Sequence, residues 1–490
     1  MALEPLAPET RNLIDGKLVA ASNGNTFLNV NPTTEEVLGA TADGTKDDML
    51  AAVTAARRAF DESGWANDAA FRAKCITQLH EGLVAEKEQL RSIVVHEAGA
   101  PVSLTGYMHV DNPIGMMTYW ADKASSYAYE RRMSDIEFLG AQQGRLLRRE
   151  PVGVVGAITP WNVPLYLNIA KIGPALAAGC TVVLKPAPDT PWSATHLGKI
   201  IALRTDIPAG VVNIVASADH LTGEILSGDP RIDLVTFTGS TATGRRIMEC
   251  AAPTLKKIFL ELGGKSANIL LDDAAFEAIV PSGAMTCVHG GQGCAITTRM
   301  LLPRARYEEG VALLAKAFES WNYGDPTEPQ NLQGPQVSQR QQERVLEYIE
   351  KGRKEGARVV VGGGKPDRKG FFVEPTLFAD VDPDSTIAKE EIFGPVLCVI
   401  PHDGDDDAVR IANDSVYGLS GAVHSASVER ALAVARRIRT GTISVNGHQW
   451  FHPDTPFGGY KQSGVGRENG EQGFEEYLET KVIAVPPQGA

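Results

Sequence analysis

The chain has 490 residues and a formal net charge of −13, and without a basic cluster it offers no electrostatic basis for binding nucleic acid or anionic lipid. The length exceeds what one hydrophobic core holds and predicts two or three domains. No apolar run approaches the roughly 20 residues that cross a bilayer, and the first ten residues lack the apolar segment of a secretory signal. The six scattered cysteines predict reduced thiols, so we expect a cytoplasmic protein.

The first part of the chain is predicted to be helical. Thr45 and Asp48 have capping-box spacing. Apolar residues then recur on one helical face: Met49, Ala52, Val53, Ala56 and Phe60. Similar patterns continue to about residue 124. The helical period is lost over residues 135–150, where Gly140 and Gly144 predict turns between short strands.

From Pro151 onward, predicted strands and helices alternate. The first strands are at residues 152–159, 181–185, 211–215, 232–239 and 256–262. Alternation of this kind predicts right-handed βαβ units and a doubly wound parallel sheet, so a Rossmann-like domain is expected before Glu261. A second alternating set has strands at residues 358–363, 396–401, 420–425 and 441–447. The fold class is therefore α/β, with a second α/β domain that contains Cys294.

The last apolar segment, residues 477–485, is typical of a strand. A strand at the end of a chain forms a sheet edge, and an exposed edge favours pairing with another subunit.

One cysteine differs from the other five in its surroundings. Cys294 follows three glycines and a glutamine in the stretch HGGQGCAITTR, where glycines leave backbone amides uncovered. The thiol there is either a nucleophile with an amide donor beside it or a small residue in a tight loop.

Three polar side chains follow predicted strands of the first sheet, at the carboxyl edge where open α/β sheets bind ligands. Asn162, in TPWNVP, either donates an N–H to a developing oxyanion or caps the helix that starts at Pro164. Glu261, in LELGGKS, is either a desolvated general base or a surface residue. Lys185, in LKPAPDTP, has a position suited to a ribose or a phosphate.

The turn TFTGSTATG, residues 236–244, has G-x-x-x-x-G spacing and no following lysine, so it is not a P-loop. A helix follows it, and helix N-termini favour phosphate, which makes Ser240 a candidate pyrophosphate contact. No metal site is expected, because the histidines at 96, 448 and 452 lack the partners of a zinc motif. His289 lies in the loop of Cys294, but nothing in the sequence marks it as a base for the thiol.

Together these stretches resemble the aldehyde dehydrogenase superfamily over nearly the whole length. The motifs occur in the family's order: TPWNVP, LKPAPDTP, FTGST, LELGGKS, GGQGCA, EEIFGPV and PFGGYKQSGVGRE. The resemblance implies a Rossmann-like cofactor domain (residues 1–124 and 145–261) and a catalytic α/β domain (262–463). It also implies a small β oligomerisation segment (125–144 and 474–490) in a homodimer or homotetramer.

The resemblance implies a mechanism as well. The Cys294 thiolate adds to an aldehyde, and the Asn162 side chain with the Cys294 amide holds the resulting oxyanion of the thiohemiacetal. Hydride passes to NAD, with NADP left open, and Glu261 activates the water that hydrolyses the thioester to a carboxylic acid. The residues implied in cofactor binding are Thr159, Pro160, Trp161, Lys185, Gly239, Ser240, Glu391 and Phe393.

Three positions depart from the commonest family pattern. Pro188 replaces a glutamate that binds the adenosine ribose, which removes a charge that would repel a 2′-phosphate; NAD is nevertheless the expected cofactor. Val163 replaces a frequent phenylalanine, and Ala295 follows the nucleophile, so the substrate tunnel is expected to be roomy. Aromatic residues expected near the tunnel are Tyr166, Trp450 and Phe451. A medium or bulky hydrophobic aldehyde, aliphatic or aromatic, is the predicted substrate.

Three other functions fit parts of the pattern: a cysteine-dependent esterase or hydrolase, a relative that forms acyl-CoA, and a non-catalytic binding protein. The hydrolase would use Cys294 and Glu261 without a cofactor. Retention of these two residues together with Asn162 argues against a non-catalytic role, and Glu261 as a hydrolytic base favours the free acid over acyl-CoA.

Overall fold

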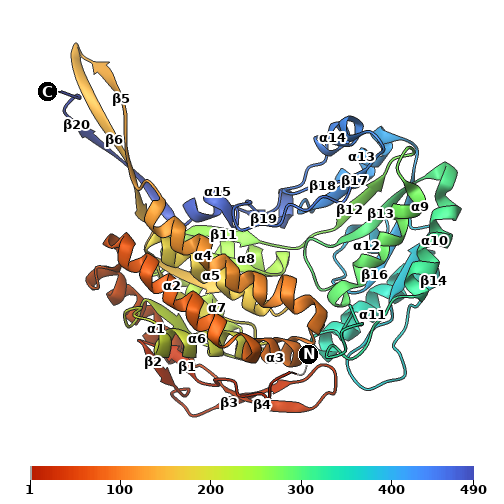
Figure 1. Cartoon of the computed structure of the whole chain (residues 1–490), viewed down its shortest axis with the longest axis horizontal. Helices are drawn as coiled ribbons and strands as arrows, with labels where there is room; N and C mark the ends of the chain where they lie inside the picture. The colour runs from red at the N-terminus through yellow and green to blue at the C-terminus, as the bar shows by residue number, and fades with distance from the viewer. Residues whose placement is uncertain (1–2, 490) are drawn as a thin grey trace.

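The computed structural model describes residues 3–489, which form two mainly parallel β-sheets and an arm that projects from the first (Figure 1). The described residues exclude Met1 and Ala2, at the start of the predicted cofactor domain, and Ala490, at the end of the predicted oligomerisation segment. Within residues 3–489 no helix is long and apolar enough to span a membrane.

The first sheet contains the strands predicted between residues 151 and 262. In sheet order, its strands are β19 (Gly464–Val465), β11 (Lys257–Glu261), β10 (Leu234–Thr238), β7 (Val154–Ile158), β8 (Thr181–Lys185), β9 (Val212–Ile214), β1 (Asn12–Ile14) and β2 (Lys17–Val19). The run from β11 to β9 is parallel, which confirms the predicted doubly wound sheet. A separate hairpin pairs β3 (Thr26–Val30) with β4 (Val37–Ala42).

Helices cover both faces of this sheet. They are α1 (Lys46–Glu62), α2 (Ala69–Ala85), α3 (Lys87–Ala98), α4 (Asp111–Ser126), α5 (Pro164–Ala178), α6 (Trp192–Arg204), α7 (Leu221–Gly228) and α8 (Thr241–Ala251). Helix α1 begins with the predicted capping box between Thr45 and Asp48. Its predicted apolar face is buried with α7 and α8 against one side of the sheet, while α5 and α6 pack on the other side beneath α2 and α4.

The second sheet is built from the later part of the chain. In sheet order, its strands are β14 (Arg358–Val361), β15 (Thr376–Ala379), β16 (Val396–His402), β13 (Thr297–Pro303), β12 (Ser266–Leu270), β17 (Gly421–His424) and β18 (Ser444–Val445). The helices of this part are α9 (Phe276–Ile279), α10 (Tyr307–Glu319), α11 (Gln339–Lys354), α12 (Thr386–Lys389), α13 (Asp405–Asn413) and α14 (Val428–Ala435). Of the strand predicted over residues 441–447, only Ser444–Val445 forms a strand, β18. The other predicted strands of this set are present as β14, β16 and β17.

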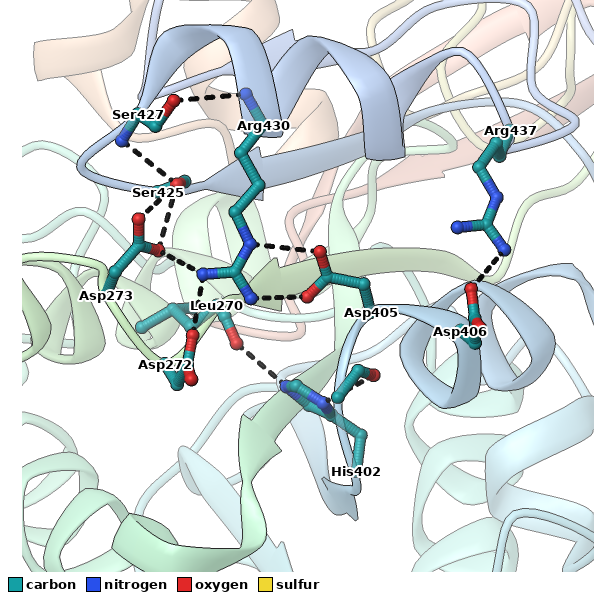
Figure 2. A network of polar contacts seen from close by, with 11 residues as sticks. Leu270, Asp272, Asp273, His402, Asp405, Asp406, Ser425, Ser427, Arg430 and Arg437 are labelled. Carbon is teal, nitrogen blue, oxygen red and sulfur yellow. Dashed lines mark hydrogen bonds and ion pairs between the residues drawn. The ribbon is translucent and has the colours of Figure 1, made fainter.

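A polar network closes the carboxyl edge of the second sheet (Figure 2). The Arg430 guanidinium, from α14, donates two hydrogen bonds to Asp405 at the start of α13, at 2.9 and 2.6 Å, and a third to Asp272 after β12 at 2.7 Å. Below it, the buried His402 ring contacts the Leu270 carbonyl oxygen at 2.8 Å. These side chains tie the strand ends together at the carboxyl edge of the second sheet.

The projecting arm is a sheet in which β6 (Ala141–Pro151) lies between β5 (Glu130–Phe138) and the C-terminal β20 (Leu478–Val485), as Figure 1 shows. The short helix α15 (Gly470–Glu475) precedes β20. The predicted terminal strand and the turn at Gly140, with φ +81°, are confirmed. The turn predicted at Gly144 is wrong: this glycine lies inside β6, where a Cβ atom would come within 2.5 Å of the Pro486 carbonyl oxygen. The small size of Gly144 allows this close packing. Strand β6 continues to Pro151, past residue 144, where the first part of the predicted oligomerisation segment was expected to end.

Candidate active site

The two sheets meet where β11 ends and β12 begins. Glu261 is the last residue of β11, and five residues later Ser266 opens β12, so the carboxyl edge of the first sheet faces the amino edge of the second. Cys294 precedes β13 by a short loop and therefore reaches the same junction. A cleft of about 1420 Å³ lies here, lined by residues of both halves.

Most of the predicted site residues line this cleft. They are Pro160, Trp161, Asn162, Gly239, Ser240, Glu261, Cys294, Glu391 and Phe393. Thr159 and Lys185 lie outside its lining. Chain segments more than 130 residues apart in sequence, such as those of Asn162 and Cys294, are thus brought together as the sequence motifs predicted.

Cys294 is partly exposed to the cleft, and its loop packs closely on the end of β11. A Cβ atom at Gly264 would come within 2.5 Å of the Cys294 carbonyl oxygen, so a glycine is required for this approach. Burial raises the pKa of the Cys294 thiol well above its ordinary value, and the neighbouring Glu261 carboxylate raises it further. The resting thiol is therefore protonated, and a base must take its proton before it attacks.

Glu261 is 1% exposed, which excludes the surface alternative. Burial raises the pKa of this carboxyl group well above its ordinary value, and the negative charge of Glu468 adds to the effect. Its Oε1 atom has no hydrogen-bond partner within the described residues. A desolvated carboxylate with a free oxygen beside a thiol has the properties of a general base.

An ion pair next to Glu261 was not predicted from the sequence. Lys171 of α5 donates to Glu468 Oε1 at 2.6 Å, and the two side chains are 0% and 1% exposed. Lys171 also lies 4.4 Å from the ring centroid of Phe259. The available signal was Lys171 as the single charged residue of the largely apolar helix α5, because lysine is rarely buried without a partner.

Asn162 does not cap the helix that follows it. Helix α5 has Val163 at its N-cap position and no side-chain capping bond, whereas the Asn162 amide nitrogen donates to the Gln292 carbonyl oxygen at 2.9 Å. Gln292 lies two residues before Cys294, so the amide is held toward the nucleophile's loop. The capping alternative is excluded, and one amide hydrogen remains for a ligand.

The N-terminus of α8 opens on the cleft through Gly239, Ser240 and Thr241. Ser240 is the N-cap residue, and its hydroxyl accepts from the Thr243 amide at 3.2 Å. The buried hydroxyl of Thr238, at the end of β10, also lines the cleft and has no partner within the described residues. Free backbone N–H groups at a helix start suit a phosphate.

Lys185 and Thr159 are buried near the carboxyl ends of β8 and β7, outside the lining of the cleft. Lys185 ends β8, and its amine donates to the Ser217 carbonyl oxygen at 3.2 Å; burial lowers the pKa of this amine to about 8. The Thr159 hydroxyl donates to Asn168 Oδ1 at 2.7 Å. The Lys185 amine has further N–H donors beyond this one bond, and the roles of Lys185 and Thr159 in cofactor binding stay predictions.

The opposite wall of the cleft carries Glu391 and Phe393. Glu391 accepts from the Gly264 amide at 2.8 Å, and burial raises the pKa of its carboxyl group to about 7. Phe393 has a positive φ of 60°, a strained conformation outside glycine that often marks functional sites. Its ring meets Trp161 edge to face, with centroids 5.4 Å apart.

The remaining wall is apolar. A buried cluster contains Met116, Val163, Tyr166, Leu167 and Ala170, with Met108 and Phe451 packed against it. The three aromatic residues expected near the tunnel, Tyr166, Trp450 and Phe451, all line the cleft. The Phe451 ring lies 5.6 Å from that of Tyr166 and 6.2 Å from that of Trp450.

His289 is not placed as a base for the thiol. Its Nε2 contacts the Asn162 carbonyl oxygen at 2.7 Å, and burial lowers the pKa of the ring to about 4. His289 therefore does not serve as the base of a cysteine hydrolase, whereas the hydrolase alternative that pairs Cys294 with Glu261 stays a prediction. Among residues 3–489 there is also no cluster of three or more side chains suited to a metal ion.

A thiol, a buried carboxylate and an amide that converge between two parallel-sheet halves define a cysteine-dependent α/β enzyme. Comparison with known families gives the particular one: residues 19–483 match the family model described as "Aldehyde dehydrogenase family". The chain belongs to the aldehyde dehydrogenase family.

Relatives match over nearly their full lengths. The 3-succinoylsemialdehyde-pyridine dehydrogenase of a Pseudomonas species is 42% identical over 476 residues, 96% of this chain and 97% of that protein. A Mycobacterium tuberculosis aldehyde dehydrogenase crystallised with NAD+ is 42% identical, with a TM-score of 0.94 over 99% of this chain and 100% of that one. A variant of Pseudomonas syringae aldehyde dehydrogenase C, crystallised with NAD+ and octanal, is 41% identical, with a TM-score of 0.92 over 98% of each chain.

Proposed function

We propose that this enzyme oxidises hydrophobic aldehydes, aliphatic or aromatic, to carboxylic acids with NAD+. The observation that carries the proposal is the convergence of Cys294, Glu261 and Asn162 on one cleft, which also holds the N-terminus of α8. Thiol, carboxylate and amide supply a nucleophile, a base and an oxyanion donor, and the helix start supplies a phosphate site.

The cleft fits a dinucleotide. The start of α8 offers backbone donors, and the Thr238 hydroxyl, which has no partner within the described residues, also lines the cleft. The Glu391 carboxyl group lines it as well and accepts from the Gly264 amide. Ser240 and Trp161 would contact the pyrophosphate, while Glu391 and Phe393 would hold the nicotinamide riboside. When bound, NAD+ supplies the acceptor for a hydride.

Within this site the chain's own residues carry out the remaining chemistry. Glu261 takes the proton of the Cys294 thiol, because its own raised pKa makes it a sufficiently strong base. The thiolate adds to the aldehyde carbon, and the Asn162 amide together with the Cys294 backbone N–H binds the oxyanion. After oxidation leaves a thioester on Cys294, Glu261 releases the thiol's proton to solvent and is a base again. It then removes a proton from the attacking water; hydrolysis releases the acid, and Glu261 returns that proton to the Cys294 thiolate.

The substrate class follows from the apolar wall. Val163 and Tyr166 are 8% exposed and belong to a cluster without a charged member, and Phe451 packs against it. A hydrocarbon chain or an aromatic ring gains roughly 25 cal/mol per Å² of apolar surface buried there, whereas a charged substrate would lose solvation. The Pseudomonas syringae relative was crystallised with octanal, a linear aldehyde. The relative from a Pseudomonas species is named for a semialdehyde that carries a pyridine ring.

A spectrophotometric screen tests the proposal. Linear, aromatic and charged aldehydes are incubated with NAD+ or NADP+, and NAD(P)H formation is followed in the purified enzyme and in Cys294→Ala. We expect the largest kcat/KM for hydrophobic aldehydes with NAD+, and no oxidation by Cys294→Ala although it still binds NAD+. Highest kcat/KM for short charged semialdehydes would refute the substrate class.

The same reactions separate the alternative chemistries. Free acid as the product, with or without coenzyme A, is expected for hydrolysis assisted by Glu261; an acyl-CoA product would identify the acylating reaction instead. Full ester turnover without nicotinamide, and no aldehyde-dependent NADH, would identify a hydrolase.

We also propose a homo-oligomer of two or four subunits in the cytoplasm. The arm supports the first part, because β5 and β20 leave open edges, and Phe138, Leu139 and Val482 are exposed apolar residues upon it. The six cysteines, all free, fit a reducing compartment. Light scattering of the purified enzyme tests the subunit number: a monomeric mass would contradict the oligomer.

A further inference from the structure

His289 has an unusual position for a histidine. Its φ of 52° and ψ of 33° are left-handed, which favours glycine or asparagine, and glycines follow it at 290 and 291. The side chain is 2% exposed, and its Nε2 lies 2.7 Å from the Asn162 carbonyl oxygen. Because a carbonyl oxygen only accepts, Nε2 carries the hydrogen and donates it.

This bond completes a ring of three hydrogen bonds. The Asn162 amide nitrogen donates to the Gln292 carbonyl oxygen at 2.9 Å, and the Gln292 amide nitrogen donates to the His289 carbonyl oxygen at 3.0 Å. His289 then donates back to Asn162. The ring therefore fixes Asn162 at its main chain through His289 and at its side chain through the loop of Cys294.

Neighbouring segments hold the three hydrogen-bonded residues, Asn162, His289 and Gln292, in place. Gln292 also donates to the Pro335 carbonyl oxygen at 3.2 Å and accepts from the Val337 amide at 2.9 Å. The His289 ring packs edge to face on His109, with centroids 4.6 Å apart. His109 is fully buried and its ring nitrogens have no partner among the described residues, so it contributes packing and not a hydrogen bond.

We propose that His289 is a positioning residue for the oxyanion amide. It acts through Asn162: by holding that residue's carbonyl group, it sets the direction of the side chain whose free N–H faces the cleft. The inference rests on the proposed function, because it assigns His289 to the same oxyanion step. A donor displaced by about 1 Å is expected to lose on the order of 10²-fold in rate, since such sites depend on preset geometry.

The test compares two buried histidines that make the same kind of bond. His289→Phe keeps an aromatic ring and removes the donor; His289→Gln keeps an amide that can donate to the same carbonyl. The matched control is His402→Phe, because His402 is also 2% exposed and contacts a main-chain carbonyl oxygen at 2.8 Å, but at the far edge of the second sheet (Figure 2). His289→Met replaces His289→Phe if the latter does not fold.

We expect His289→Phe to lower kcat by about 10- to 100-fold, with KM for the aldehyde and the Kd for NAD+ changed less than about two-fold. His289→Gln should recover most of kcat. His402→Phe should lower the melting temperature without lowering kcat. The rate of Cys294 alkylation by iodoacetamide, which needs no oxyanion donor, should stay unchanged in all of these variants.

A double-mutant cycle with Asn162→Ala decides whether His289 acts through Asn162. In that background, His289→Phe should cost less than about three-fold, because the group that it positions is already gone. Equal losses in both backgrounds, or a wild-type kcat for His289→Phe, would overturn the inference. If the unmodified enzyme forms no NADH from any aldehyde, the proposed function itself fails, and this result is separate from the comparison of variants.

Discussion

The buried Lys171–Glu468 pair gives a prediction whose sign can be worked out from the structure. The pair lies next to Glu261, and its two charges act on that carboxyl group in opposite directions: Glu468 raises the pKa of Glu261, and Lys171 lowers it. Lys171→Met should therefore move the pKa of Glu261 further up, and Glu468→Gln should move it down. The two substitutions should therefore shift this pKa in opposite directions.

The stability cost of the same changes follows from the geometry. At the separation of 2.6 Å, Coulomb's law with an effective dielectric constant of about 20 gives an attraction of about 6 kcal/mol. The side chains are 0% and 1% exposed, so removal of one partner leaves an uncompensated buried charge. Each single variant should lose about 3–5 kcal/mol in the free energy of unfolding, and the double variant less than the sum.

The assay is the pH dependence of the hydrolytic phase. After the first turnover, the steady-state rate at saturating aldehyde should increase with pH as Glu261 loses its proton. The midpoint should be more alkaline than wild type in Lys171→Met and more acidic in Glu468→Gln. Midpoints that move in the same direction, or not at all in folded variants, would refute the electrostatic argument and leave the pair a purely structural role.

Three other substitutions test the site. Glu261→Gln should slow the burst of NADH, because no carboxylate then takes the thiol proton, and slow the later turnovers as well, because water activation is also lost, both measured by stopped flow; an unchanged steady state would contradict its role as base. Asn162→Ala should lose on the order of 10²–10³ in kcat, and a loss below tenfold would remove it as the oxyanion donor. Glu391 has a pKa raised from 4.5 to about 7, so its contribution to stability is present below pH 4.5 and lost as the pH rises to 7. Urea unfolding should therefore show Glu391→Gln gaining about 1–3 kcal/mol over wild type between these pH values; a constant difference would contradict the burial effect.

Local patterns in the sequence determined much of the fold. The capping box at Thr45 and the alternation of apolar strands with helices depend on neighbours in the chain, and both predictions are confirmed. The motifs also predicted that Cys294, Glu261 and Asn162 would share one site. Asn162 and Glu261 follow strands of one parallel sheet, so they meet at the same edge whatever the details of packing. The place of Cys294 beside them was implied only by the resemblance to the aldehyde dehydrogenase superfamily.

Other features depended on contacts between distant segments. Gly144 was expected to be a turn and proved to be a packing site, because the Pro486 carbonyl oxygen approaches it from the other end of the chain. The two candidate roles of Asn162 could be separated only by the direction of its amide, which the Gln292 carbonyl oxygen sets.

The sequence by itself determined the class of the fold, because the alternation of strands and helices is a short-range pattern, and its resemblance to the aldehyde dehydrogenase superfamily indicated the candidate reactive groups. Only the tertiary structure decided the pKa shifts of Glu261 and Cys294 and the direction of the Asn162 amide. The Lys171–Glu468 pair joins residues 297 positions apart, and the bond from His289 to Asn162 spans 127. Desolvation and hydrogen-bond direction are properties of the folded surroundings, and no local pattern in the chain contains them.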